Sequence, residues 1–357
     1  ALLPMALVAA EAQPGVYFEH EDWELACDNT LTCRAAGYQV DDAVLSLSVL
    51  LTREGGPNQA VSGKLMLGSY DDSTWDHLPN VVNLSLYINE QSAGELTMTK
   101  PKLTGDLTPG QVTALLDAVV GTSYIEFRYQ PARGASTSWY LSDQGASAVL
   151  LKMDEFQGRL DTPGALVRKG NRDEASVPPP VPVPVVRAAP LPAPLPGDEN
   201  FVQNNAAALL DALRPTVSET ISEDDDTFCP ALIDPEYDWD FGPVEMIMAA
   251  TRLNDGKMLL RAHCWEAAYN NNGDGYWVIN DVAPYAPVLV TTSAIGDEDG
   301  AIFSYHWGRG EGDCISEERW TWDGEQFVHT SAYSTGMCKM VTLGGPWTLP
   351  TIVTEVK

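Results

Sequence analysis

Residues 178–196 read PPPVPVPVVRAAPLPAPLP and contain nine prolines in 19 residues. Proline fixes φ and lacks a backbone N–H, so this stretch is a poor helix and a poor central strand. The composition predicts an extended polyproline II spacer of up to ~60 Å, at about 3.1 Å per residue. We therefore divide the chain into a domain at residues 13–176, a Pro-rich linker at residues 177–199 and a second domain at residues 200–357.

Six cysteines lie as two before this linker and four after it. Even numbers on each side are what disulfides within each domain require, so the split predicts an exported protein in an oxidising compartment. Four cysteines allow three pairings, and we favour the two that join neighbours in the chain. The predicted disulfides are Cys27 with Cys33, Cys229 with Cys264, and Cys314 with Cys338. The C-x-x-C clusters typical of zinc sites do not occur.

Residues 1–12 resemble the end of a secretory signal peptide. An apolar run leads to Ala10-Glu11-Ala12, which matches an A-x-A cleavage site. An apolar first strand of the mature fold is the alternative interpretation. No later segment reaches the ~20 uninterrupted apolar residues that span a bilayer. We therefore expect a periplasmic or secreted protein without membrane insertion.

The chain carries a formal net charge of −29. Residues 1–176 contain 12 basic and 23 acidic side chains, and residues 177–357 contain 9 and 27. A field of this sign repels phosphate backbones and anionic lipids, which argues against nucleic acid as a partner. It attracts a cationic envelope or secreted protein, although acidity also serves solubility alone.

Local patterns predict an α+β fold for the first domain. Apolar residues alternate in residues 44–51 and 81–88, the period of half-buried antiparallel strands. Thr108 opens the sequence TPGQ, a capping box with proline at the first helical position, and a second helix is expected from Ser142. Residues 13–176 should therefore form a mixed antiparallel sheet with two helices.

The second domain begins with an expected helix at residues 200–213 and then changes character. Short apolar segments follow, separated by turn sequences such as Asn254-Asp255-Gly256, in which glycine supplies the positive φ of a hairpin. This pattern predicts a mainly antiparallel β domain, built as a sandwich or as an open meander.

A candidate calcium loop begins at Asn270. Asn270, Asn272 and Asp274 occupy alternate positions and Asp281 is twelfth, which approaches the oxygen-ligand pattern of an EF-hand loop. The first position lacks Asp, the twelfth lacks Glu, and the flanking segments are expected strands. The sequence NNGDG is also an ordinary hairpin turn. Apart from this calcium hypothesis, no cofactor is expected.

Seven of the ten tryptophans follow the linker. Trp320 and Trp322 are two residues apart, so on a strand both side chains face the same side. Together with Trp307 they would form a stacking platform for sugar rings if they were exposed. A tryptophan-rich core is the alternative.

Catalytic signatures are scarce. The patterns G-x-S-x-G, S-x-x-K and H-E-x-x-H do not occur. An acidic chain offers many carboxylates, so acid–base catalysis by a carboxylate pair stays open. On balance the sequence favours a binding protein over an enzyme.

Several motifs resemble one known family. They are WELACDNT at Trp23–Thr30, CRAAGY at Cys33–Tyr38, MDEFQGRL at Met153–Leu160, HWGRG at His306–Gly310, GDC at Gly312–Cys314 and WTWDG at Trp320–Gly324. In this order the motifs resemble domain-of-unknown-function family 1176, a family of exported bacterial proteins. The resemblance implies a periplasmic or secreted location. The family has no established reaction, so the resemblance assigns no catalytic residue.

These observations predict an exported cell-envelope protein that binds a partner, with a cationic protein favoured by the charge. A glycan-binding module that uses Trp307, Trp320 and Trp322 is the first alternative. An envelope hydrolase with paired carboxylates is the second.

Overall fold

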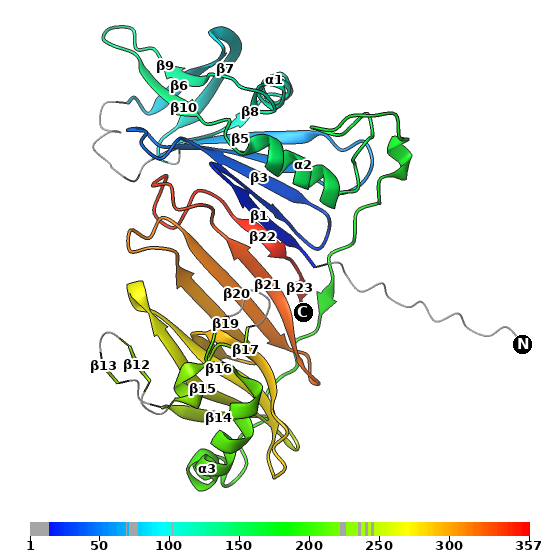
Figure 1. Cartoon of the computed structure of the whole chain (residues 1–357), viewed down its shortest axis with the longest axis vertical. Coiled ribbons are helices and arrows are strands. Elements are labelled where there is room, and N and C mark those ends of the chain that lie inside the picture. The colour runs from blue at the N-terminus through cyan, green and yellow to red at the C-terminus, as the bar shows by residue number, and fades with distance from the viewer. Residues whose placement is uncertain are drawn as a thin grey trace, which may run out of the picture. The chain divides into compact units, whose positions relative to one another are not determined.

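The computed structural model describes residues 14–68, 70, 78–101, 103–221, 226–234, 237–239, 242–243 and 246–357. The proposed signal remnant at residues 1–12 lies outside these ranges. The chain divides into two compact units (Figure 1). Unit 1 extends to Pro184 and also includes Thr335–Val353, and unit 2 comprises Val185–Ser334 and Thr354–Lys357.

The described residues of unit 1 form two antiparallel sheets. The first has the order β1-β2-β3-β4-β5-β8 and the second has the order β10-β9-β6-β7. The strands of the first sheet are β1 (Val16–His20), β2 (Trp23–Cys27), β3 (Cys33–Tyr38), β4 (Leu47–Arg53), β5 (Val61–Leu67) and β8 (Thr104–Leu107). Those of the second are β6 (Val81–Ile88), β7 (Gln91–Thr99), β9 (Ile125–Tyr129) and β10 (Thr137–Leu141).

Two helices complete unit 1, α1 (Pro109–Val119) and α2 (Ala146–Phe156). The predicted capping box at the start of α1 is present, because Thr108 and Gln111 each accept a hydrogen bond from the other's backbone N–H. The predicted antiparallel sheets and helices are present, but strands predominate over helices in the described part of the chain. Alternation along β6 sends Val82, Leu84 and Leu86 into the main core and leaves the other face of the second sheet outward.

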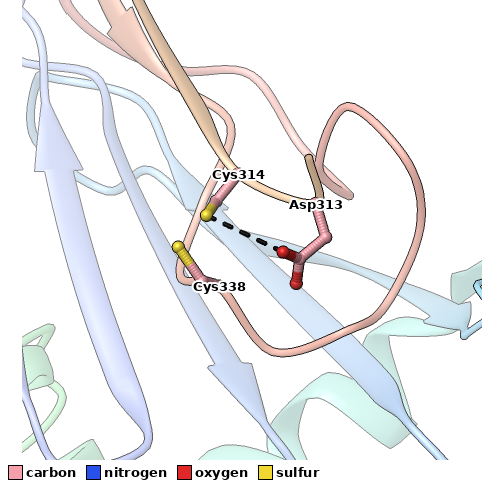
Figure 2. A group of neighbouring side chains, drawn as sticks. All are labelled: Asp313, Cys314 and Cys338. Atoms are coloured by element: carbon pink, nitrogen blue, oxygen red, sulfur yellow. Dashed lines mark hydrogen bonds between the residues drawn. The ribbon is translucent and has the colours of Figure 1, made fainter. Parts of the chain in front are cut away.

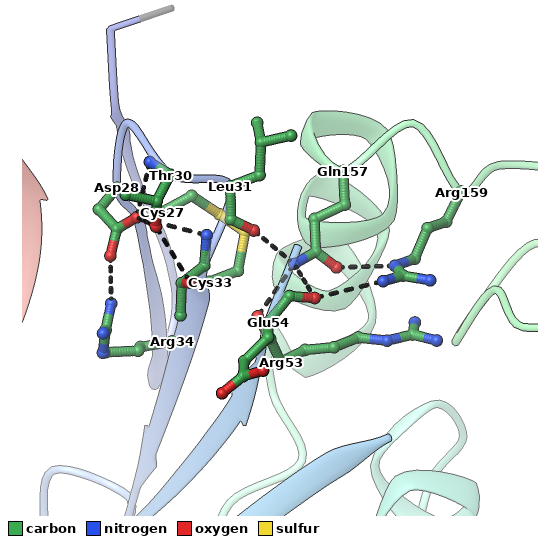
Figure 3. The surroundings of a disulfide bond; sticks show 11 residues. Cys27, Asp28, Thr30, Leu31, Cys33, Arg34, Arg53, Glu54, Gln157 and Arg159 are labelled. Atoms are coloured by element: carbon green, nitrogen blue, oxygen red, sulfur yellow. Dashed lines mark hydrogen bonds and ion pairs between the residues drawn. A yellow bond between two sulfur atoms is a disulfide. The ribbon is translucent and has the colours of Figure 1, made fainter. Parts of the chain in front are cut away.

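The disulfide Cys27–Cys33 joins β2 to β3 at directly paired positions (Figure 3). Asp28 stabilises the turn that the disulfide closes. Its carboxylate accepts a hydrogen bond from the backbone N–H of Thr30 and forms an ion pair with Arg34. From the helix side, the Gln157 amide donates to the carbonyl of Leu31 at 2.8 Å. The short loop is thus held by side chains from three separate segments.

The predicted extent of the second domain needs a correction. Residues 200–357 were assigned to one domain, but Thr335–Val353, which includes β22 (Leu349–Ile352), packs within unit 1. Its apolar side chains cover the outward face of the first sheet. This second small core of unit 1 contains Ala26, Ala36, Tyr38, Val341, Trp347 and Leu349.

In the part of unit 2 that the structure describes, there are two larger antiparallel sheets and two α-helices. One sheet consists of β14 (Met248–Asn254), β15 (Lys257–Ala267), β16 (Asn271–Asn280) and β17 (Val288–Ala294). The strands that unit 2 contributes to the other sheet are β18 (Gly296–Glu298), β19 (Ala301–Trp307), β20 (Ile315–Trp322) and β21 (Phe327–Ser334). The helices are α3 (Phe201–Leu213) and α4 (Pro230–Ile233), and the short strand pairs are β11 (Val185–Val186) with β23 (Glu355–Val356) and β12 (Asp238–Trp239) with β13 (Gly242–Pro243).

The sheet of β14 to β17 is covered on both faces. On β15, Leu260 faces a core shared with Leu209 of α3, while Leu259 faces a second core shared with Ile302 of β19. Unit 2 is therefore layered as helices, sheet and sheet, which is the sandwich alternative of the prediction. The remaining face of β19, β20 and β21 points away from both cores.

The proline-rich segment is packed along the two units instead of forming an uncovered spacer. In unit 1, the N–H of Val181 donates to the carbonyl of Thr30. In unit 2, β11 pairs in parallel with β23, and Ala189 and Leu191 pack against the second core. The valines, alanines and leucine between the prolines supply the backbone donors and apolar contacts that a pure polyproline stretch lacks.

Among the described residues, no helix is both long and apolar enough to cross a membrane.

Candidate functional site

The outward face of β19, β20 and β21 carries a groove of about 350 Å³. It is lined by residues of β19, β20 and β21 and by the residue before β18, namely Ile295, Phe303, Ser304, Tyr305, Glu317, Glu318, Arg319, Ser331 and Tyr333. This volume lies at the lower end of the range of small-ligand pockets. The unit 2 groove, as we call it, therefore suits a single side chain of a partner better than a large cofactor.

Strand register brings the groove residues together. Tyr305 of β19 pairs with Glu317 of β20, and Glu317 in turn pairs with Tyr333 of β21. Directly opposed residues on one face of a sheet have Cβ atoms about 5 Å apart, so the carboxylate lies between two phenol rings. The adjacent row across the same strands consists of Phe303, Arg319 and Ser331.

The electrostatics of the groove centre on Glu317. Burial raises the pKa of Tyr333 well above its usual range, and the neighbouring Glu317 carboxylate adds to this effect. Burial and the charge of Glu317 also raise the pKa of Tyr305. Both phenols therefore stay protonated at neutral pH. The charge of Glu317 is thus flanked by neutral aromatic rings, an arrangement that suits a cation.

One end of the groove is closed by Phe303 and bordered by Arg319. Phe303 lies over Gly296, where an added Cβ would stand 2.8 Å from Cζ of the ring, so a glycine is needed for this close approach. Arg319 is exposed, and within the described part of the chain its guanidinium forms no ion pair or hydrogen bond.

The predicted tryptophan platform is wrong. Trp320 and Trp322 do share one side of β20, as their spacing predicts, but that side faces the second core of unit 2. Their exposed fractions are 6% and 1%, so neither ring is available to stack on a sugar. Trp307 lies on the groove side, is 37% exposed, and contacts Tyr305 edge-on with 5.4 Å between ring centroids.

The predicted calcium loop is also wrong, because its four ligands do not converge. Asn272 and Asp274 lie within β16, and Asn270 and Asp281 flank the two ends of that strand. Ten extended residues span roughly 30 Å, far more than one ion can bridge. The run NNGDG continues the strand because its backbone pairs with β15.

Both carboxylates of the proposed calcium set have protein partners instead. The Oδ1 atom of Asp274 lies 2.9 Å from Nδ1 of His263, and Asp281 forms an ion pair with Arg252 at 3.1 Å. These oxygens therefore connect neighbouring segments of unit 2.

All six cysteines are disulfide-bonded. The bridges Cys27–Cys33 and Cys229–Cys264 are those predicted, which leaves Cys314 and Cys338 as the third pair. Figure 2 shows these last two sulfurs beside Asp313, and the ligand-type atoms of the three residues lie within 4.8 Å of one another. Because a disulfide sulfur is not a thiolate, this group lacks the soft ligands of a zinc site.

Tyr305, Glu317 and Tyr333 are not among the site residues predicted from the sequence. Their signal was the alternation along β19 and β20, which places residues 303, 305 and 307 on one face and residues 315, 317 and 319 on one face. Alternation does not say which of the two faces is covered by another layer. The tryptophans of β20 lie on the buried face.

The fold and the groove define a class: a disulfide-bonded protein of two mostly antiparallel β units with a shallow acidic and aromatic site on an outer sheet face. Three disulfides are consistent with an exported protein. The chain belongs to the family described as "Protein of unknown function (DUF1176)", whose family model matches residues 17–354. This match confirms the resemblance found in the sequence. No curated protein and no solved structure matches the chain.

Proposed function

We propose that this chain is an exported binding protein, periplasmic or secreted, which holds a basic side chain of a partner protein in the unit 2 groove. The observation that carries the proposal is the position of Glu317 between Tyr305 and Tyr333. A carboxylate supplies the counter-charge, and each ring face adds about 0.5–2 kcal/mol of cation–π attraction, depending on desolvation.

The charge of the chain supports the same partner. Residues 177–357 contain 27 acidic and 9 basic side chains, so a basic protein is drawn toward this half before any contact forms. The groove then selects among the cations that arrive.

The two alternative functions find less support at this site. Glu317 and Glu318 both line the groove, but they are adjacent on one strand, so their side chains point to opposite faces of the sheet. The Glu318 carboxylate lies 3.3 Å from His329, and the two glutamates do not form the facing pair of a glycosidase-type hydrolase. The glycan hypothesis depended on exposed Trp320 and Trp322, and both are buried.

The test is a binding titration with the full-length oxidised protein. The probe is a fluorescein-labelled nine-residue peptide with capped ends, in which arginine and lysine alternate with glycine. We expect Glu317→Gln to weaken binding at least tenfold, because the substitution keeps the shape of the side chain but removes the charge.

Glu325→Gln is the matched control. Glu325 is exposed in the turn between β20 and β21, outside the groove, and its substitution removes the same unit of charge from the same hairpin. We expect its affinity to stay within about twofold of the parent. Equal losses of affinity in the two variants would mean that Glu317 acts only through the overall negative charge of the protein. Absence of binding by the parent protein would refute the proposal.

A further inference from the structure

A second row of the same composition exists in unit 1. Tyr140 of β10 pairs with Glu126 of β9, and Glu126 pairs with Tyr87 of β6. As in unit 2, a glutamate on the central strand lies between two tyrosines on the outward face of an antiparallel sheet. Each glutamate is also followed, two residues later on the same face, by an arginine: Arg128 in unit 1 and Arg319 in unit 2.

In unit 1, Arg128 contacts the glutamate and one tyrosine of the row. Nε and Nη2 of Arg128 lie 2.9 and 2.5 Å from the two carboxylate oxygens of Glu126, a two-pronged contact that matches the planar fork of the guanidinium. The central carbon of the guanidinium lies 4.3 Å from the centroid of the Tyr87 ring. Glu126 is nearly buried, with 5% exposure, and the hydrogen bond from Arg128 lowers its pKa.

In unit 2 the arginine is not engaged in this way. Within the part of the chain that the structure describes, Glu317 forms no ion pair with Arg319, and the guanidinium of Arg319 makes no ion pair or hydrogen bond. The contact between glutamate and arginine that unit 1 forms internally is thus not made by the chain itself in the unit 2 groove.

We infer that the unit 2 groove recognises a guanidinium, the side chain of an arginine on the partner protein, in preference to the ammonium of a lysine. This inference rests on the proposed function and specifies the ligand of the same groove. The Tyr140–Glu126–Tyr87 row shows how such a ligand is held: two parallel hydrogen bonds to the carboxylate and a tyrosine ring beneath the cation. Lysine offers a compact point charge that cannot make the two-pronged contact.

Four capped peptides that differ at one central residue test the inference. The probes contain arginine, lysine, citrulline or norleucine within the same glycine-serine sequence, and affinity is measured by calorimetry with the oxidised full-length protein. We expect the arginine peptide to bind at least fivefold more tightly than the lysine peptide. Citrulline has nearly the shape of arginine without its charge, and its peptide should bind at least tenfold more weakly than the arginine peptide.

The outcomes separate this inference from the proposed function. Equal affinities for arginine and lysine, both lost in Glu317→Gln, would overturn guanidinium selectivity and leave the basic-partner proposal standing. Binding of neither peptide would overturn both. Equal affinities for arginine and citrulline would show that shape alone is read and would also overturn both.

A variant of unit 1 gives an independent measurement. Arg128→Gln removes the internal guanidinium from the Tyr140–Glu126–Tyr87 row and exposes the Glu126 carboxylate on the outer face. We expect the stoichiometry for the arginine peptide to rise from one to two per chain. A stoichiometry that remains at one, with an intact thermal transition, would contradict the equivalence of the two rows from which the guanidinium assignment is drawn.

Discussion

Arg319 is the single side chain that competes most directly with a cation in the unit 2 groove. It follows Glu317 by two residues on the same face, a separation of about 7 Å along the strand. Its charge opposes an incoming arginine, and its side chain is long enough to reach the carboxylate. We expect Arg319→Gln to tighten binding of the arginine peptide about threefold, as measured by calorimetry.

Arg187→Gln removes the same charge from an exposed position of unit 2 that does not line the groove, and it should change the affinity little. A weaker affinity of Arg319→Gln would show instead that Arg319 contacts the bound peptide.

Glu24 of β2 is a fully buried carboxylate in unit 1. Tyr38 and Tyr17 donate hydroxyl hydrogen bonds to it, and the backbone N–H of Met337 donates at 2.7 Å. Burial still raises the pKa of Glu24 above its ordinary value of 4.5. The folded protein therefore holds this proton more tightly than the unfolded chain. The wild-type protein loses stability as the pH rises from the pKa of Glu24 in the unfolded chain to its raised pKa in the folded protein.

The substitution Glu24→Gln should reveal this linkage, because its cost in unfolding free energy should depend on pH. The amide keeps the hydrogen-bonding shape without a titratable proton, so the variant does not share the loss. We expect its cost in unfolding free energy to be larger at pH 5 than at pH 8, measured by urea unfolding of both proteins. The exposed Glu90→Gln in the same unit serves as the charge control. A cost that grew with pH would mean that the fold stabilises the Glu24 anion.

Among the elements, the segment Thr335–Val353 has the clearest structural role, because it covers the outward face of the first sheet of unit 1. Trp347 is 8% exposed and its indole N–H donates to the hydroxyl of Ser48 at 2.7 Å. We expect Trp347→Ala to lower the unfolding free energy of unit 1 by about 3–5 kcal/mol.

Leu343→Ala in the same segment is the matched control, since Leu343 is 70% exposed. Its cost should stay within about 0.5 kcal/mol in the same denaturant titration. A comparable cost for both variants would mean that the segment contributes through its backbone and not through the tryptophan.

Elements with strong local signals could be predicted from the sequence, whereas those stabilised by neighbours could not. The capping box at Thr108 and the alternation at residues 81–88 gave α1 and β6 correctly. Residues 271–275 read as a turn because their composition is polar and glycine-rich. They form half of β16 because β15 supplies their backbone partners, which is information outside the local sequence.

The candidate site was harder to predict than the fold for the same reason. Residues 305, 317 and 333 belong to three strands, and only the register of those strands puts one carboxylate between two phenols. The sequence correctly showed that Trp320 and Trp322 share a side. It could not show that another sheet covers that side, because the layer order of unit 2 arises from contacts distant in the chain.

On the scale of the whole molecule, the net charge of −29 and the groove should act on different steps of binding. A diffuse field steers a basic partner and mainly raises the association rate, an effect that salt screens over about 8–10 Å at physiological ionic strength. A charge inside a groove, in contact with its ligand, mainly slows dissociation and is screened much less.

Stopped-flow measurements with the arginine peptide at about 0.05 and 0.5 M salt separate these steps. For the parent protein, we expect the association rate to fall severalfold with salt while the dissociation rate changes less. Glu317→Gln should dissociate at least about fivefold faster at both salt concentrations, because the contact that it lacks is short-ranged. Glu325→Gln should dissociate at the parental rate and differ, if at all, in association at low salt. If the whole deficit of Glu317→Gln lay in the association rate and vanished at high salt, Glu317 would be one more charge of the general field and not the floor of a binding site.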